Sequence, residues 1–288
     1  MIPHSGGINI DNIITTERIE AYCLSLLADE RSAGTISKYH RDLTAFSLWL
    51  DGRAVTKETA AGWKSHLSHR GYAPCTVNSM LAAVNGFCHF MAWHIKVKFL
   101  KIQRQIFRDS AKELTKEEYD RLLTAARESG QERLVLIMET LCATGIRVSE
   151  LRYITVEAAK AGRATITLKG KIRTILLPTK LCRKLVKYAR KQKIAAGEIF
   201  LTSSGKGISR RQVWFELKRL CKAAGVEPSK VFPHNLRHLF ATTFYRAQRD
   251  IVRLADMLGH SSIDTTRIYL MVSGAEQQRQ LDRLGLIS

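Results

Sequence analysis

Polar residues in the C-terminal half of this chain have types and spacings suited to chemistry on a phosphate ester. Arg147 follows the turn sequence TGI, and Glu150 stands three residues later, one helical turn away. His234 and Arg237 share one face of a predicted helix in the sequence HNLRH. Guanidinium groups stay charged and bind anionic oxygens through paired hydrogen bonds. The two arginines are therefore candidates for holding a phosphate.

Three further residues complete the set of candidates. Lys169 lies at the tip of a predicted β-hairpin, His260 ends a predicted helix in the sequence LGH, and Tyr269 follows nine residues later. Each residue has a simpler interpretation when it is taken alone. A lysine in a turn is ordinarily solvated, an arginine and a glutamate one helical turn apart form a surface ion pair, and a tyrosine beside apolar residues belongs to a core.

The order of these motifs is more informative than any one of them. TGIRVSEL, a hairpin KG turn, HNLRH, LGH and a tyrosine nine residues beyond resemble the tyrosine recombinase (phage integrase) family over residues 112–288. The resemblance implies that Arg147 and Arg237 are the catalytic arginines and that Glu150 is the acid that supports Arg147. It implies that Lys169 is the hairpin lysine and that His234 is the histidine of the H-x-x-R pair. His260 then stands at the family's His/Trp position, and Tyr269 is the nucleophile.

The hairpin turn departs from the family pattern. Family members commonly have a longer Gly-Lys-Gly turn, whereas the sequence LKGK stands at residues 168–171 here. The shorter turn leaves the catalytic lysine open between Lys169 and Lys171. Lys169 is the favoured candidate because it directly precedes the glycine.

The resemblance implies a covalent phosphotyrosine at the DNA 3′ end. Tyr269 has a reference pKa of about 10, so nearby arginines would ease its deprotonation and His234 could accept the proton. Lys169 could protonate the leaving 5′-oxygen, and His260 could donate a hydrogen bond to the developing charge. The sequence has no P-loop, no HExxH motif and no carboxylate cluster for paired Mg²⁺ ions, and His234 and His238 lack further ligands at metal spacing. We therefore expect no metal and no other cofactor.

The charge balance favours a nucleic-acid partner. The 288 residues include 46 Lys+Arg and 26 Asp+Glu, a formal net charge of +20. A hydrophobic content of 45% is ordinary for a globular protein, which argues against disorder. No long apolar segment or secretory signal is evident, and the six scattered cysteines are typical of reduced thiols. The sequence thus predicts a cytoplasmic protein without membrane association.

The hydrophobic pattern predicts a mainly α-helical chain of two domains. Residues 12–97 are expected to form a four-helix domain, with Thr16 and Thr35 as the first two helix caps. By the resemblance, this is the family's core-DNA-binding (SAM-like) domain. Residues 98–111 are a basic linker, and residues 112–288 are a mixed α+β catalytic domain with a small antiparallel sheet.

Local signals divide the second domain further. A capping box begins at Thr115, an apolar helix ends at Gly145, and helices resume from about Ser209. Alternating apolar residues and a glycine turn between these helices predict short strands. The predicted strands are residues 164–168, 172–177 and 199–202.

Basic residues predict the DNA-facing surfaces. Residues 158–197 contain twelve lysines and arginines and no acid, which favours a phosphate-facing surface over a solvated helix face. The helix that starts near Ser209 is the best candidate for entering a groove, because arginine and glutamine can read base edges. Solubilising surface charge is the competing interpretation of each residue. The candidate DNA contacts are Lys38, Arg41, Lys171, Arg210 and Arg211.

The resemblance also suggests the partners. We expect double-stranded DNA carrying specific recombination sites, gripped between the two domains and synapsed by a homotetramer. The apolar end of residues 275–287 is expected to dock on a neighbouring copy, and accessory proteins are further candidate partners. The role in integration, excision or resolution stays open.

Two other functions share these features. A DNA-binding protein could keep the fold and lose catalysis, but the catalytic set is intact here. A type IB topoisomerase-like enzyme shares the chemistry, but the separate helical front domain and the compact size favour recombination.

Overall fold

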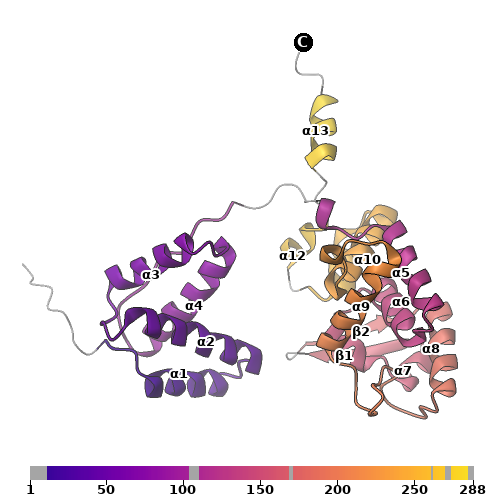
Figure 1. Cartoon of the computed structure of the whole chain (residues 1–288), viewed down its shortest axis with the longest axis horizontal. Coiled ribbons are helices and arrows are strands. Elements are labelled where there is room, and N and C mark those ends of the chain that lie inside the picture. The colour runs from indigo at the N-terminus through magenta and orange to yellow at the C-terminus, as the bar shows by residue number, and fades with distance from the viewer. Residues whose placement is uncertain (1–11, 104–109, 169–170, 261, 270–273, 285–288) are drawn as a thin grey trace, which may run out of the picture. The chain divides into compact units, whose positions relative to one another are not determined.

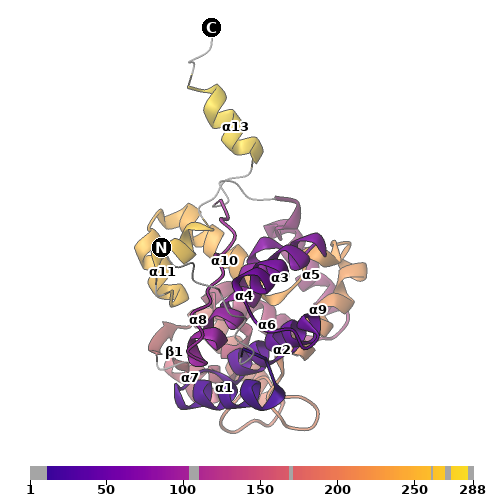
Figure 2. The same cartoon turned by 90° about the vertical axis from the view of Figure 1, so that its left-hand side faces the viewer.

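The computed structural model describes residues 12–103, 110–168, 171–260, 262–269 and 274–284. The chain divides into two compact units, Met1–Arg104 and Gln105–Ser288, which Figure 1 and the rotated view in Figure 2 show by colour. The described residues are mainly helical and include a small antiparallel sheet, which confirms the predicted fold class. None of the described helices combines the length and the apolar content needed to cross a bilayer.

Helices of the first unit pack around one apolar core. Thr15, Ser32 and Thr56 each accept a hydrogen bond from an amide of the first helical turn, and Pro74 starts the last helix, where its missing N–H costs nothing. The helices are α1 (Thr16–Ala28), α2 (Ala33–Leu50), α3 (Lys57–His69) and α4 (Pro74–Phe90). Their buried side chains include Leu43, Phe46, Leu50, Leu67, Leu81 and Phe87.

The first two helix caps differ from those predicted. The N-cap of α1 is Thr15 rather than Thr16, and that of α2 is Ser32 rather than Thr35. In α2, the Thr35 amide donates to the Ser32 hydroxyl at 3.3 Å, so Thr35 lies inside the first turn. Each helix start offers two hydroxyl residues, and the one with an extended backbone is the cap.

Two asparagines of α4 hold the segment that leaves the first unit. The Asn85 amide group bonds both backbone groups of Val97 at 2.9 and 3.0 Å, and Asn78 does the same for Leu100 at 2.7 and 2.9 Å. A side-chain amide carries both a donor and an acceptor, so each asparagine can bond the N–H and the C=O of one residue, as a neighbouring strand would. The first residues of the segment expected to be the 98–111 linker are therefore fixed to α4.

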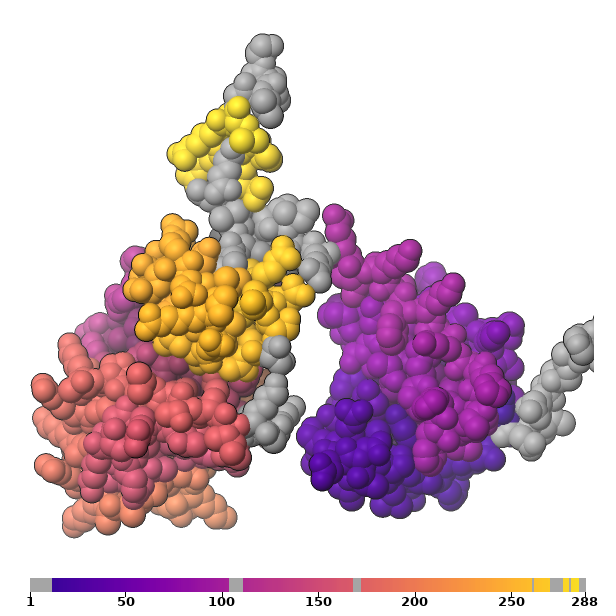
Figure 3. Space-filling view, turned by 180° about the vertical axis from the view of Figure 1, so that it is seen from behind, coloured from indigo at the N-terminus to yellow at the C-terminus, as the bar shows by residue number. Residues whose placement is uncertain are grey.

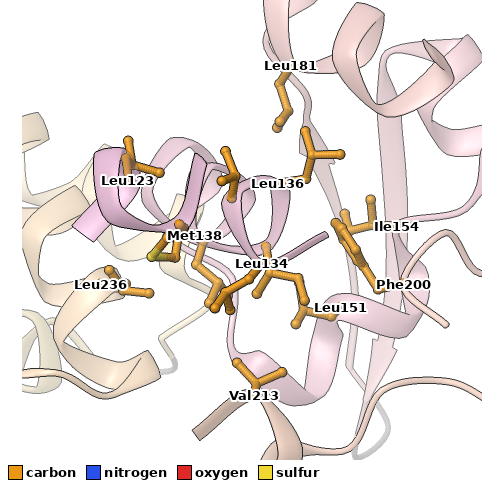
Figure 4. Packing of buried hydrophobic residues seen from close by; sticks show 14 of the residues in the cluster. Leu123, Leu134, Leu136, Met138, Leu151, Ile154, Leu181, Phe200, Val213 and Leu236 are labelled. Carbon is orange, nitrogen blue, oxygen red and sulfur yellow. The ribbon is translucent and has the colours of Figure 1, made fainter. Parts of the chain in front are cut away.

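The second unit is organised around α6. This helix buries apolar residues on most of its surface, so α5, α8, α9 and α10 pack against it. Figure 4 shows Leu134 and Met138 of α6 among side chains of the surrounding elements, including Val213 and Leu236. The elements of this unit are η1 (Ser110–Lys112), α5 (Lys116–Glu128), α6 (Glu132–Thr144), η2 (Val148–Tyr153), α7 (Val156–Ala161), β1 (Arg163–Leu168), β2 (Lys171–Leu176), α8 (Thr179–Lys191), α9 (Arg210–Ala224), η3 (Pro228–Lys230), α10 (Pro233–Gln248), α11 (Ile251–Leu258), α12 (Ile263–Arg267) and α13 (Gly274–Asp282).

Three helix boundaries of this unit agree with the sequence prediction. Thr115 and Glu118 form the capping box of α5, Gly145 ends α6 in the left-handed conformation, and Ser209 caps α9. These signals are local in sequence, so they do not depend on tertiary contacts.

The sheet has two strands in the described residues. β1 and β2 are antiparallel, with Arg163 opposite Leu176, close to the predicted bounds. The predicted third strand at 199–202 is wrong: there, Leu201 makes only an isolated bridge with Gly207. The backbone groups of this run bond to two different segments, so no continuous ladder forms.

A smaller apolar cluster joins α10, α11 and the residues after α12. Its buried members are Phe240, Ala241, Leu254, Leu258 and Tyr269. In the space-filling view, α11 and α12 belong to the golden-yellow part of the second unit's surface (Figure 3).

Gly145 brings this cluster close to the end of α6. Its φ is +64°, and an added Cβ would lie 2.3 Å from Cδ1 of Phe240 and 3.0 Å from Cδ2 of Leu258. Only a residue without a side chain fits both the backbone conformation and the space.

We expect Gly145→Ala to lower the free energy of unfolding by about 2–4 kcal/mol, from backbone strain of about 1 kcal/mol and overpacking of about 1–3 kcal/mol. Gly162 ends α7 with φ +70° and has open space at the Cβ position. Gly162→Ala should therefore lose only the backbone contribution of about 1 kcal/mol. Denaturant unfolding of both variants measures the difference, and equal losses would contradict the close packing at Gly145.

Candidate active site

The turn after α6 presents Arg147 to a cavity. Arg147 is the N-cap of η2 and has an extended backbone. The cavity has a volume of about 610 Å³, and Arg147, His234 and Arg237 are among the residues that line it. The side chain of Arg147 is 43% exposed, so it can reach an anion bound there.

Glu150 binds two arginines from inside the protein. Its carboxylate is 1% exposed and accepts hydrogen bonds from the Arg147 amide at 2.7 Å and from Arg147 Nη1 at 3.3 Å. Its Oε2 also accepts from Arg173 Nη2 at 2.7 Å. A buried carboxylate is stable only when it is paired, so Glu150 fixes both guanidinium groups.

Sequence reasoning missed Arg173. Besides Glu150, its Nη1 donates to the Met257 carbonyl oxygen at 2.7 Å. A Cβ at Gly259 would lie 2.6 Å from this Nη1, so glycine makes the close approach possible. Arg173 thus connects β2 to η2 and to the end of α11. A signal was present in the strand, because Arg173 is two residues from buried Ile175 and therefore on the inward face.

Arg237 is a buried cation at the centre of the site. It is 2% exposed, and its Nη1 donates to the Gly145 carbonyl oxygen at 2.6 Å. Its Nη2 donates to the Leu258 carbonyl oxygen at 2.8 Å and lies 2.9 Å from Nε2 of His260. Burial and the charge of Arg147 lower its pKa, and the Tyr269 hydroxyl opposes that change. Arginine nevertheless stays charged in proteins, so the site holds a desolvated positive charge.

His260 links Arg237 to α12. Its Nδ1 lies 2.8 Å from the hydroxyl oxygen of Thr266, and its Nε2 faces Arg237. Burial, followed by the charges of Arg237 and Arg147, lowers the pKa of His260 to about 4. The imidazole is therefore neutral near pH 7.

Tyr269 lies directly after α12 and is 4% exposed. Its amide donates to the Thr266 carbonyl oxygen at 3.0 Å. Its ring stacks on His260 with centroids 6.0 Å apart, and it meets the ring of His238 edge to face at 4.7 Å. The structure therefore brings Tyr269, His260 and Arg237 together.

His234 lies in the first turn of α10 with an exposed side chain, and it lines the cavity. Partial desolvation, followed by the charges of Arg237 and Arg147, lowers its pKa. A neutral imidazole can accept a proton. Across the described ranges, no group of three or more His, Cys, Asp or Glu residues lies close enough to hold a metal ion.

The hairpin lysines are not described in the same detail. Lys169 lies outside the described residues, as does the side chain of Lys171. The backbone of Lys171 begins β2, where it pairs with Leu168.

The candidate DNA contacts fall into two groups. In the first unit, the Lys38 ammonium bonds to the buried carboxylate of Asp42, and Arg41 Nη2 lies 3.8 Å from the same carboxylate while its side chain stays 74% exposed. In the second unit, Arg210 and Arg211 line the same cavity as Arg147. Lys38 and Arg41 therefore share an internal acidic partner, whereas Arg210 and Arg211 face the cavity in which an anion could bind.

Two aromatic residues of the cavity were also missed. Trp214 of α9 and Phe232 line it, and Trp214 is 46% exposed. An exposed tryptophan four residues after Arg210 shares that residue's helix face, and this spacing was the available signal. The cavity thus combines cations with flat apolar surface.

Part of the basic stretch 158–197 is neutralised within the protein. Lys184 pairs with Glu139 at 2.6 Å, and Lys191 pairs with Glu132 at 2.6 Å. These acids belong to α6, outside the stretch. The absence of acids in the local sequence therefore overstates the charge that faces outward.

Two families match this chain. The Phage integrase family matches residues 112–276, and the family described as Phage integrase, N-terminal SAM-like domain, matches residues 19–94. Among curated proteins, tyrosine recombinase XerC of Roseiflexus castenholzii is 33% identical over 279 residues, which cover 88% of each chain. Tyrosine recombinase XerA of Pyrococcus furiosus is 28% identical over 285 residues, which cover 96% of this chain and 97% of the relative.

Solved structures share the fold. A lambda integrase tetramer bound to a Holliday junction superposes with a TM-score of 0.72 at 20% identity, covering 93% of this chain and 80% of the other. XerH recombinase bound to its difH substrate in a pre-cleavage complex gives a TM-score of 0.69 at 19% identity, covering 96% and 85%.

We expect Arg173→Ala to lower the free energy of unfolding by about 3 kcal/mol, because it removes one partner of a buried ion pair and leaves the Met257 carbonyl without its donor. Arg163→Ala is the matched control, since Arg163 lies on the same hairpin with an exposed side chain. That variant should change stability by less than about 0.5 kcal/mol. Denaturant unfolding measures both, and a small loss for Arg173→Ala would show that the pair with Glu150 is not structural.

Proposed function

The chain belongs to the phage integrase family, the tyrosine site-specific recombinases, and from that membership we propose that it cleaves and rejoins DNA through a covalent 3′-phosphotyrosine at Tyr269. The observation that carries the proposal is the meeting of Tyr269, His260 and Arg237 beside a cavity that Arg147 and His234 line. Burying a guanidinium beside a cavity is costly, and this cost is expected where the cavity binds an anion.

The scissile phosphate binds between Arg147 and Arg237. Two fixed cations neutralise its charge and stabilise the additional charge that develops during attack, and loss of one such donor typically costs about 3–4 kcal/mol in the transition state. Glu150 holds Arg147 in place through the bonds described above. His260 donates a further hydrogen bond to the phosphate.

Cleavage exchanges one ester for another. The Tyr269 oxygen bonds to phosphorus while the bond from phosphorus to the 5′-oxygen breaks. His234 accepts the phenolic proton, and Lys169 gives a proton to the leaving oxygen. The phosphotyrosine retains the energy of the broken bond, so rejoining needs neither ATP nor a metal ion.

The proposed partner is duplex DNA with specific recombination sites. The helical domain, residues 12–97, and the catalytic domain, residues 112–288, would each contact the duplex, and the basic linker at 98–111 would join them. Arg41, Arg210 and Arg211 are proposed contacts. The enzyme would act in integration, excision or resolution.

We expect wild-type protein, mixed in EDTA with a library of nicked duplexes, to yield DNA covalently attached after denaturation. Tyr269→Phe should bind the same DNA and yield no adduct, because it lacks only the phenolic oxygen. Sequencing the attached strands would identify the target site.

The other outcomes of that assay would contradict the proposal in different ways. Adducts from both proteins would mean that another residue is the nucleophile. Binding by both without adducts would indicate either a DNA-binding protein that has lost catalysis or a missing partner protein.

We also propose a homotetramer on synapsed DNA in which α13 docks on a neighbouring copy. Leu281 and Leu284 are 51% and 60% exposed, an apolar pair that an isolated chain would not favour. Leu286 and Ile287, which extend the apolar pattern, lie outside the described residues.

Truncation after Gly274, or Leu281→Ser with Leu284→Ser, should abolish synapsis while single-site DNA binding persists. Arg283→Ala, an exposed position beside them, is the control. Native gel electrophoresis with the site recovered by the covalent assay measures both steps. Unchanged synapsis in the truncated protein would overturn docking in trans.

A further inference from the structure

We propose that the Thr266 hydroxyl is a positioning group that controls which ring nitrogen of His260 carries the proton, and hence whether His260 can donate to the phosphate. The inference rests on the proposed function, because it assigns a task to a residue behind that site. Thr266 has no assigned role in the reaction described above.

The hydrogen-bond chain fixes the tautomer of His260 in the DNA-free protein. A guanidinium can only donate, so His260 Nε2, which lies 2.9 Å from Arg237 Nη2, must be the acceptor. A neutral imidazole carries one proton, which then sits on Nδ1. Nδ1–H accordingly donates to Thr266 Oγ1 at 2.8 Å.

Protonating both nitrogens does not provide an alternative near neutral pH. Burial disfavours the imidazolium, and so do the positive charges of Arg237, Arg147 and Arg173. His234 adds to the same effect. His260 therefore becomes a donor toward the cavity only if its single proton moves from Nδ1 to Nε2.

That exchange requires a partner for Nδ1 that can both accept and donate. A bound phosphate would draw the Arg237 N–H groups toward its own oxygens and release His260 Nε2. With the proton on Nε2, Nδ1 becomes an acceptor and needs a donor. A hydroxyl meets both demands by rotating, whereas a carbonyl only accepts and an ammonium only donates.

The position of Thr266 makes its hydroxyl difficult to replace with solvent. Thr266 is fully buried at 0% exposure. Its carbonyl oxygen also accepts a hydrogen bond from the amide of Tyr269 at 3.0 Å. One residue thus bonds the imidazole through its side chain and the nucleophile's backbone through its main chain, and a side-chain substitution leaves the second bond in place.

The first arm of the test uses no DNA. Nitrogen-15 NMR of histidine-labelled protein reports which ring nitrogen of His260 is protonated, with His260→Gln used to assign the signal. The expected result at neutral pH is Nδ1–H in the wild-type protein and in Thr266→Ser. Protonation at Nε2 in the DNA-free wild type would overturn the inference.

The second arm measures the rate of covalent adduct formation on the site recovered by the trapping assay. Thr266→Val keeps the shape and removes the hydroxyl, and we expect a loss of about 10- to 100-fold, as for removal of the hydrogen-bond partner behind a metal-coordinating histidine. Thr266→Ser should stay within a few-fold of wild type. Thermal unfolding checks that each variant is folded.

A double-mutant cycle separates this role from a general structural one. If Thr266 acts through His260, Thr266→Val should cause no further loss in a His260→Gln background. An undiminished loss in that background, or a normal rate in the single variant, would overturn the inference. Absence of adducts from the wild-type protein would instead overturn the proposed function, while the NMR arm would still decide the tautomer.

Discussion

The architecture of the second unit depends on the burial of Arg237. Taking a guanidinium out of water is costly unless its donors are bonded, and here its fixed partners include the carbonyl oxygens of Gly145 and Leu258. Those carbonyls belong to residues at the ends of α6 and α11, so the position of each helix end is set by the need to satisfy one side chain. The turn glycine supplies one of these carbonyl groups, and His260 lies two residues after the other.

The charges of the site do not cancel. Among the described residues, the site holds three guanidinium groups, those of Arg147, Arg173 and Arg237, and one buried carboxylate, that of Glu150. Glu150 bonds the first two, and the third is left with neutral partners. A site with this excess of fixed positive charge is stabilised by an anion, and a phosphodiester supplies one negative charge in a form that guanidinium groups bind in pairs.

Most of the fold could be predicted because its signals are local. The capping box at Thr115 and the left-handed glycine at Gly145 need no knowledge of tertiary contacts. The run at 199–202 failed as a strand because strand formation depends on a partner that the local sequence does not reveal. Thr35 failed as a cap because Ser32, also a good cap residue, lies three positions before it.

In the candidate site, too, residues with local sequence signals were predicted and residues that act through distant contacts were not. Ordered motifs were enough to find Arg147, Arg237 and Tyr269, since each lies in a recognisable stretch of sequence. Arg173 was missed because its importance comes from contacts with residues far away in the chain, Glu150 and Met257. Lys38 has an acidic partner one helical turn away, which a count of basic residues overlooks.

The packing of Tyr269 bears on which subunit of an assembly supplies this tyrosine. Its ring lies in an apolar cluster with Phe240 and Leu258 of the same chain and stacks on that chain's His260. The tyrosine proposed as the nucleophile is thus packed among residues of its own chain, so in this geometry a chain would use its own tyrosine rather than its neighbour's. In an assembly of several copies, bond breakage would be a property of each subunit, whereas the order in which subunits act would belong to the contacts between them.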